Sequence, residues 1–316
     1  MSVSITWWVA FNLGVLALLG MDLFLLRRGR RAPTFGHALG WSIFWVLLAG
    51  IFGAGIGLGW VGAYATNERG PACLQFFTAF SLEESLSLDN VFVWVLLFQH
   101  FQVPAAQQRG VLTCGSLVAM AMRAVMILGG VALARHFHWV FYLFGAYLLW
   151  AAVKMWRPQK LPAAPGKNPL WNLARRWLHT TEDNPDGKIF LRRQGLWFAT
   201  PLLGVLLTLE LADVTFAFDS VPAVLAVTTD AFIAFTSNIL AVLGLRALFF
   251  LLQHVIERCW MLHYGLAVLL GFIGLKMLTA DYLTVPLAAS LAIITVILAG
   301  SVGGSWLIKA PQRAHS

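Results

Sequence analysis

The chain has 316 residues, of which 59% are hydrophobic and 11% are charged, and its formal net charge is +8. Soluble domains carry about 25% charged residues, so this composition excludes an ordinary soluble protein. The three cysteines are solitary, which argues against a disulfide framework and against a thiolate metal site. Because the apolar runs are long and continuous rather than alternating, we expect an all-α membrane protein and not a β-barrel.

Nine apolar runs are long enough to cross a bilayer. In chain order they are 4–26, 41–63, 73–98, 111–134, 138–156, 196–221, 231–252, 262–279 and 285–308. We therefore predict about nine transmembrane helices in a single polytopic membrane domain covering residues 1–316. The one long link, 157–195, is rich in Pro, Lys and Arg, and it is expected to be a basic surface loop or a short amphipathic segment.

The basic residues alternate across this nine-span arrangement. One side holds Arg27, Arg28, Arg30, Arg31, Arg109, Arg157, Lys160, Lys167, Arg175, Arg176, Lys188, Arg192, Arg193, Arg258, Lys309 and Arg313, and the other side holds Arg69 and Arg135. The positive-inside rule then places the N-terminus outside and the C-terminus and the 157–195 loop in the cytoplasm. We interpret the positive charge as a topology signal, not as a surface for nucleic acid or for particular lipids.

Three carboxylates lie inside the third predicted span, at Glu83, Glu84 and Asp89. Each charge near the middle of a membrane helix costs roughly 2.5–3.5 kcal/mol on insertion scales, and helix packing does not require that cost. The sixth span repeats the pattern, because Asp213 precedes Asp219 by the same spacing that separates Glu83 from Asp89. Two acidic stretches of this kind suggest a cation site between two repeats.

The correspondence between the two halves extends beyond the acids. Further matching pairs are Arg123 with Arg246 and Lys154 with Lys276. The first repeat then covers 73–156 and the second covers 196–279, so spans three to five correspond to spans six to eight. Paired spans that are three apart cross in opposite directions. This predicts an inverted repeat, as in many secondary transporters whose ion sites lie near the midplane between the repeats.

The two acidic stretches contain oxygen ligands and no cysteine or histidine. Besides the carboxylates they offer Asn90, Ser220, Thr215 and backbone carbonyls. Such ligands suit Mg²⁺, Ca²⁺ or Mn²⁺ and disfavour Zn²⁺ and Cu⁺. Carboxylates crowded in a low dielectric also bind protons, which suggests an exchange of metal for protons. We expect no organic cofactor.

Positions 83 and 89 lie about 120° apart around an ideal helix, so one straight helix cannot aim both acids at one ion. Either the helix breaks there or the two acids serve different steps. In the second half Pro222 favours a break, because proline cannot donate to the carbonyl of Phe218. A competing interpretation is that the acids pair with Arg123 and Arg246, which would then be structural. Asp22, near the end of span one, is either a gate ligand or an interfacial charge.

These motifs resemble the TerC family of bacterial inner-membrane proteins. The resemblance is carried by Glu83 to Val93, Thr200 to Leu202, Phe216 to Pro222, Thr236 to Ala247, Tyr264 to Ala267 and Lys276 to Leu278. It implies manganese efflux and tolerance, and historically tellurite resistance. It also implies that the functional residues are Glu83, Asp89, Asn90, Glu210, Asp213, Asp219 and Ser220. Val221 stands where the family usually has Ile, and Phe218 where it has Val; neither change removes a ligand.

Three functions remain in competition. The first is a secondary transporter, not an enzyme, that exports Mn²⁺ from the cytoplasm, with Ca²⁺ or Mg²⁺ as other candidate ions and protons as the coupling ion. The second is a membrane scaffold that supports metalation of exported enzymes, as the family resemblance allows. The third is an intramembrane hydrolase with Asp89 and Asp219 as a dyad, although no Gly-x-Gly-Asp signature is present. The oligomeric state stays open.

Overall fold

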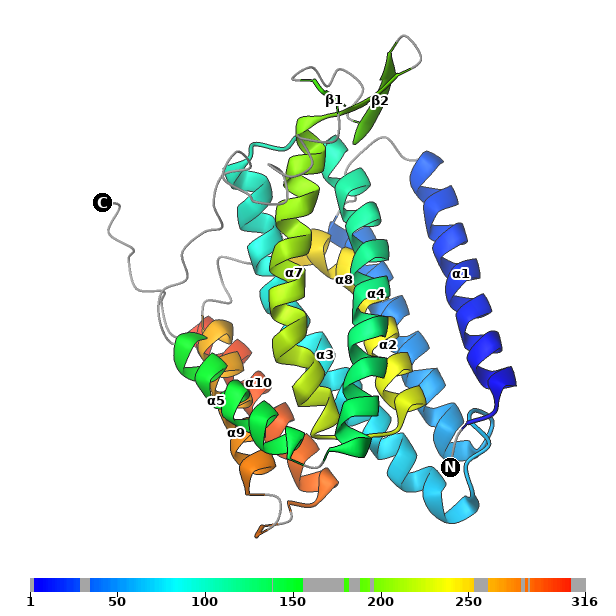
Figure 1. Cartoon of the computed structure of the whole chain (residues 1–316), viewed down its shortest axis with the longest axis vertical. Coiled ribbons are helices and arrows are strands. Elements are labelled where there is room, and N and C mark those ends of the chain that lie inside the picture. Colours follow the sequence, from blue (N-terminus) through cyan, green and yellow to red (C-terminus); the bar gives the residue numbers. More distant parts are fainter. Residues whose placement is uncertain are drawn as a thin grey trace.

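Long helices make up most of the computed structural model (Figure 1), which describes residues 3–28, 35–137, 139–155, 179–181, 188–193, 196–252, 261–279, 282–283 and 285–307. The helices are α1 (Ile5–Arg28), α2 (Phe35–Leu58), α3 (Thr66–His100), α4 (Ala105–His136), α5 (Val140–Met155), α7 (Pro201–Leu225), α8 (Ala231–Leu252), α9 (Leu262–Leu278) and α10 (Leu287–Leu307). The strands are β1 (His179–Thr180), β2 (Phe190–Arg193) and β3 (Leu196–Ala199).

Several of these helices could cross a membrane. Within the described ranges, five are long and apolar enough by length and composition, namely Phe35–Leu58, Gln107–Ala134, Pro201–Leu225, Ala231–Leu251 and Ala288–Leu307. Ile5–Met21, Val140–Met155 and Tyr264–Leu278 are shorter apolar helices. The prediction of a mostly helical chain with several candidate spans is therefore confirmed, whereas the count of nine spans and the orientation of the termini stay predictions.

The end of α2 differs from the prediction because of two glycines. The helix stops at Leu58, five residues before the predicted end at 63, and Gly59 and Gly62 have φ angles of +80° and +85°. This left-handed backbone favours glycine and ends helices. The turn is also tightly packed, since a Cβ at Gly59 would lie 2.4 Å from the guanidinium carbon of Arg69.

The helix contacts follow a regular scheme. Helix α3 packs against α8 and α7, α4 packs against α7 and α8, and α5 packs against α9. If α3, α4 and α5 are replaced in this scheme by α7, α8 and α9, respectively, and the reverse, the same pairs of contacting helices result. The contacts are consistent with the proposed inverted repeat, which itself stays a prediction.

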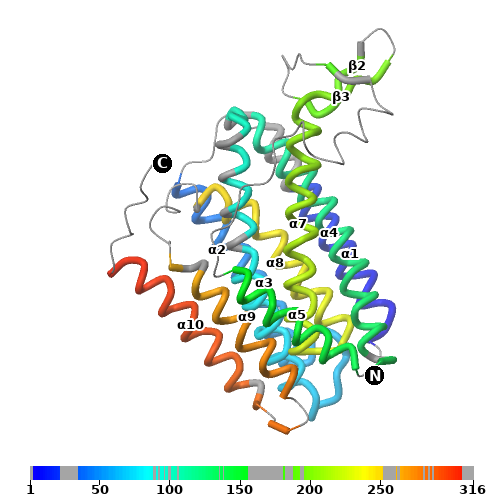
Figure 2. The backbone as a smooth tube through the Cα atoms, turned by 60° about the vertical axis from the view of Figure 1, so that its left-hand side comes forward, coloured from blue at the N-terminus to red at the C-terminus, as the bar shows by residue number. Residues whose placement is uncertain are grey.

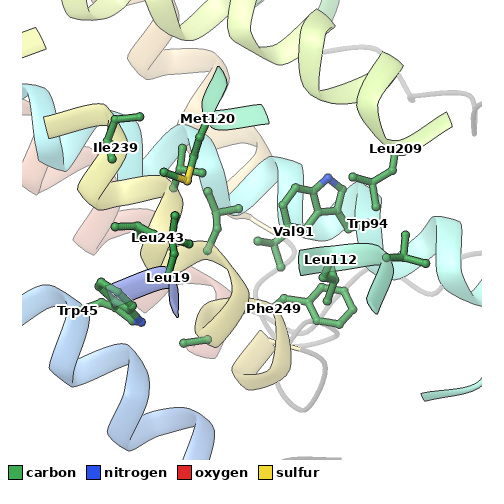
Figure 3. Packing of buried hydrophobic residues seen from close by; sticks show 14 of the residues in the cluster. Leu19, Trp45, Val91, Trp94, Leu112, Met120, Leu209, Ile239, Leu243 and Phe249 are labelled. Carbon is green, nitrogen blue, oxygen red and sulfur yellow. The ribbon is translucent and has the colours of Figure 1, made fainter. Parts of the chain in front are cut away.

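The apolar core joins both halves of the chain. Val91 and Trp94 of α3, Leu112 of α4, and Leu243 and Phe249 of α8 belong to one buried cluster (Figure 3). Between helices in a bilayer, where lipid tails are as apolar as leucine, such side chains stabilise the fold through close van der Waals packing. Helices α3, α4, α7 and α8 are thereby held around a common interior.

Helices α5, α9 and α10 form a group along one side of the molecule (Figures 1 and 2). Here α5 and α9 approach backbone to backbone at Gly145 and Gly274. A Cβ built on Gly145 would lie 3.0 Å from the Gly274 carbonyl oxygen, and one built on Gly274 would lie 2.8 Å from the Gly145 carbonyl oxygen. Small residues permit this close approach of two helices.

Part of the predicted loop 157–195 is a small sheet. In the sheet order β1-β3-β2, β3 pairs in parallel with β1 and in antiparallel with β2. The strands lie beyond the end of α7 (Figure 2). Because β3 occupies 196–199, the sixth predicted span begins at Pro201 instead of 196. Thr200 joins sheet and helix, since its Oγ1 donates to the Lys188 carbonyl oxygen at 2.8 Å.

The turn between α7 and α8 is closed by Asp230. Its Oδ1 accepts from the backbone N–H of Phe232 (2.8 Å) and of Ile233 (3.2 Å), which caps α8, and its Oδ2 accepts from the Tyr64 hydroxyl (3.3 Å). Burial and the adjacent Asp230 carboxylate raise the pKa of Tyr64 well above its usual range, so the hydroxyl stays a donor.

Asp230→Ala should therefore destabilise the protein by about 1–2 kcal/mol, because the first-turn amides of α8 lose their acceptor. Thermal unfolding of the purified protein measures this effect. Asp230→Asn is the matched control and should stay near the parent, since its side-chain oxygen still caps the helix. Equal losses in both variants would contradict the capping role.

Candidate functional site

A buried arginine on α4 joins acids from two other helices. Arg123 Nη1 lies 2.7 Å from Glu83 Oε2 of α3, and Arg123 Nε lies 3.5 Å from Asp213 Oδ2 of α7. The side chains of Arg123 and Glu83 are 1% and 0% exposed. The alternative in which the predicted acids pair with an arginine is thus confirmed for Glu83 and Asp213. These two acids come from the two stretches that the predicted inverted repeat also brings together.

This cluster is not fully satisfied. Asn90 donates from Nδ2 to Asp213 Oδ1 at 3.3 Å. Glu83 Oε1 and Asn90 Oδ1 are buried and have no hydrogen-bond partner among the described residues, whereas Asp213 Oδ2 has only the 3.5 Å ion pair with Arg123 Nε. Two carboxylates face one guanidinium, so the group keeps an excess negative charge. An unpaired buried oxygen is costly, and each such atom usually has a reason.

Glu210 lies one turn before Asp213 on α7. Its two carboxylate oxygens are buried and neither has a hydrogen-bond partner in the described part of the chain. Helix α4 passes close by at Gly115, where a built Cβ would lie 3.0 Å from Glu210 Oε1. Any larger residue at 115 would press on this carboxylate. Glu210 therefore adds a third acid on the side of α7 that faces α4.

Asp219 occupies a different environment from the Arg123 cluster. It is half-buried, and Tyr147 of α5 donates a hydrogen bond to its Oδ1 at 2.8 Å. The neighbouring Ser220 is buried, and its Oγ has no partner within the described segments. The structure thus places Asp219 against α5, whereas Glu83 and Asp213 meet at α4.

Some predicted positions lie elsewhere or outside the described part. The side chains of Asp22 and Asp89 lie outside the described residues. Arg246 of α8 donates from Nη1 to Thr113 Oγ1 of α4 at 3.4 Å.

The predicted helix break at Pro222 is wrong, because α7 continues to Leu225. Pro222 stands in the last turn, so the bond that it cannot make to the Phe218 carbonyl oxygen is followed by only three more helical residues. Helix α3 is likewise continuous from Thr66 to His100. A break of this helix between Glu83 and Asp89 is therefore wrong, and the alternative in which the two acids serve different steps stays a prediction.

The arrangement is not a ready-made cage of acids. Among the residues that the structure describes, no three His, Cys, Asp or Glu side chains come close enough together to hold a metal ion. The free acceptors instead include an amide and a hydroxyl besides carboxylates. Oxygen donors of these kinds suit a hard divalent cation that keeps part of its water.

Two further polar side chains of the described interior were not predicted to have a role. Tyr147 holds Asp219, yet a tyrosine in an apolar helix carries no signal of such a role. Asn238 of α8 is 0% exposed, and neither its Oδ1 nor its Nδ2 has a partner among the described residues. An amide inside an apolar run could have been noticed for its desolvation cost, as the acids were.

These features define a class: a helical protein with several candidate membrane spans and a buried cluster of acids around an arginine. The chain belongs to the integral membrane protein TerC family, whose model matches residues 69–313. The family resemblance expected from the acidic motifs is thereby confirmed.

Close relatives extend over most of the chain. It is 45% identical over 292 residues to a Salmonella typhi protein named "Putative membrane-bound redox modulator Alx", covering 92% of this chain and 91% of the relative. It is 46% identical over 295 residues to the protein of the same name from Escherichia coli K12, with the same shares. An uncharacterized membrane protein of Myxococcus xanthus, STKORF319, is 42% identical over 310 residues, covering 98% and 94%. No solved structure matches the chain.

Proposed function

We propose that this protein is a secondary transporter that exports a divalent cation, Mn²⁺, across the bacterial inner membrane in exchange for protons. One observation carries the proposal. Acids on α3 and α7 meet inside the helix bundle, and several of their oxygens have no partner among the described residues. A charge placed there without a function would only destabilise a membrane helix.

The charge balance favours a cation over an anion. Arg123 faces both Glu83 and Asp213, so this group keeps one carboxylate in excess. A bound cation or protons would offset this excess. The same oxygens can take either, and a carboxylate that releases a proton when metal arrives links the two fluxes.

The identity of the ion and the direction rest on other grounds. Oxygen ligands favour Mg²⁺, Ca²⁺ and Mn²⁺ over Zn²⁺. The choice of Mn²⁺ and of export follows from the resemblance to the TerC family. The proposed sidedness rests on the distribution of the basic residues, which by the positive-inside rule favours a cytoplasmic C-terminus.

Expression of the chain should lower the manganese content of manganese-loaded cells, as measured by elemental analysis. Asp89→Asn and Asp219→Asn should abolish most of this effect, because each removes a charged oxygen from an acidic stretch. The matched control is Asp230→Asn, which removes a carboxylate at the α7–α8 turn and should export normally. Full export by both Asp89→Asn and Asp219→Asn would contradict the site assignment.

The same cells separate the competing functions. A scaffold should lose its activity when 158–193 is deleted, whereas a transporter should still bind metal. An effect on the redox state of the cell with unchanged manganese would favour the role in the name of the Alx relatives.

A further inference from the structure

The amide of Asn238 is the least explained polar group in the described interior. It is 0% exposed on α8, and neither polar atom has a partner there. Neighbouring Ser237 is equally buried, but its Oγ donates to the Ala234 carbonyl oxygen at 3.2 Å. Leaving a buried amide unpaired costs about 1–3 kcal/mol, so a ligand at this position would have a strong reason to bind.

The height of Asn238 along the helix bundle can be inferred from the residues one helical turn before it. Ala234, one turn earlier on α8, shares a buried cluster with Ala79 of α3 and Ile127 of α4. Residues four apart lie on the same face of a helix. One turn beyond Ala79 is Glu83, and one turn before Ile127 is Arg123.

The helix directions make these steps agree. Thr228, just before α8, bonds to Gln75 of α3, and further along α8 a Cβ on Gly244 would lie 3.9 Å from Glu84 Oε2, so α3 and α8 run in parallel. Helix α4 runs the other way, since Arg246 reaches Thr113 while Ala234 belongs to the same buried cluster as Ile127. Moving one turn from Ala234 to Asn238 therefore leads to the level of the Glu83–Arg123 pair.

We propose that Asn238 is a further ligand of the transported cation, its Oδ1 acting with Glu83 Oε1, which has no partner among the described residues. This inference rests on the proposed function. It explains why no group of three acids is assembled in the described residues, since an amide supplies one of the ligands. A neutral ligand also leaves the excess charge unchanged, which suits an ion that must be released.

The test uses the full chain in lipid nanodiscs and Mn²⁺ alone as the probe. Asn238→Leu, which has nearly the same shape, should weaken Mn²⁺ binding measured by calorimetry at least about tenfold, since even outer partners of metal ligands are worth about 10–100-fold. Its thermal midpoint should not fall, because an unpaired amide has been removed. Ser237→Ala is the matched control and should bind as the parent does.

Asn238→Asp keeps the size and adds a charged oxygen, so it should bind Mn²⁺ more tightly and with a steeper pH dependence. If the parent binds Mn²⁺ and both Asn238 variants bind it with the same affinity, the assignment of Asn238 as a ligand is overturned, while the proposed function is not. A lower thermal midpoint of Asn238→Leu with normal Mn²⁺ affinity would show that the amide holds a structural water, and would also overturn it. If the parent binds no Mn²⁺, the proposed function fails together with this inference.

Discussion

Arg123→Gln should destabilise the protein by about 3–5 kcal/mol, the usual effect of removing one partner from a buried ion pair. The arginine is 1% exposed and lies within 2.7 Å of Glu83 Oε2 and 3.5 Å of Asp213 Oδ2, so its loss leaves both carboxylates without a counter-charge. Thermal unfolding of purified protein, together with the yield of monodisperse material, measures the change.

A second substitution provides the control for this prediction. Glu83→Gln in the Arg123→Gln background should recover part of the lost stability, because only one unpaired carboxylate then remains. Additive losses in the double variant would show that the two side chains do not stabilise each other. Arg123→Lys should be intermediate, since an ammonium group cannot reproduce the two directions in which the guanidinium donates.

Glu210→Gln should have the opposite pattern, with loss of transport and no loss of stability. Both oxygens of Glu210 are buried without a partner in the described chain, so the carboxylate contributes charge but no structural bond. We expect manganese export to fall at least about tenfold, while the free energy of unfolding stays equal or rises by up to about 1–3 kcal/mol.

Transport assays in vesicles and thermal unfolding of the same preparation separate these two effects. Asp230→Asn again serves as the acid-to-amide control outside the cluster. Normal transport by Glu210→Gln would remove Glu210 from the site. A marked loss of stability would show that this carboxylate has a structural role.

The sequence predicted the acids of α3 and α7 as neighbours because charge in an apolar helix is expensive and therefore informative. It also presented the pairing with Arg123 as an alternative, since a buried arginine needs an acceptor. Which acid that arginine reaches depends on the relative rotation of α3, α4 and α7. No pattern along the chain contains that rotation.

Other features were predicted less well. Helix α2 ends earlier than predicted because Gly59 and Gly62 adopt left-handed backbone conformations inside an apolar run. The strands around Arg192 were not expected, since short strands in a polar link have little apolar periodicity. Tyr147 bonds to Asp219, 72 residues further along the chain, so its own properties could not indicate this contact.

The glycine contact between α5 and α9 has a mechanical consequence. Helices α5 and α9 approach backbone to backbone at Gly145 and Gly274, so sliding of one along the other would require the two to separate first. We therefore expect α5 and α9 to move together as one rigid unit, with α10, which packs on α9, as part of it. The Glu83–Arg123–Asp213 cluster lies outside this rigid unit, between α3, α4 and α7. A tilt of this unit would strain the hydrogen bond from Tyr147 of α5 to Asp219 of α7. This bond therefore couples the position of α5, α9 and α10 to the acidic helix α7.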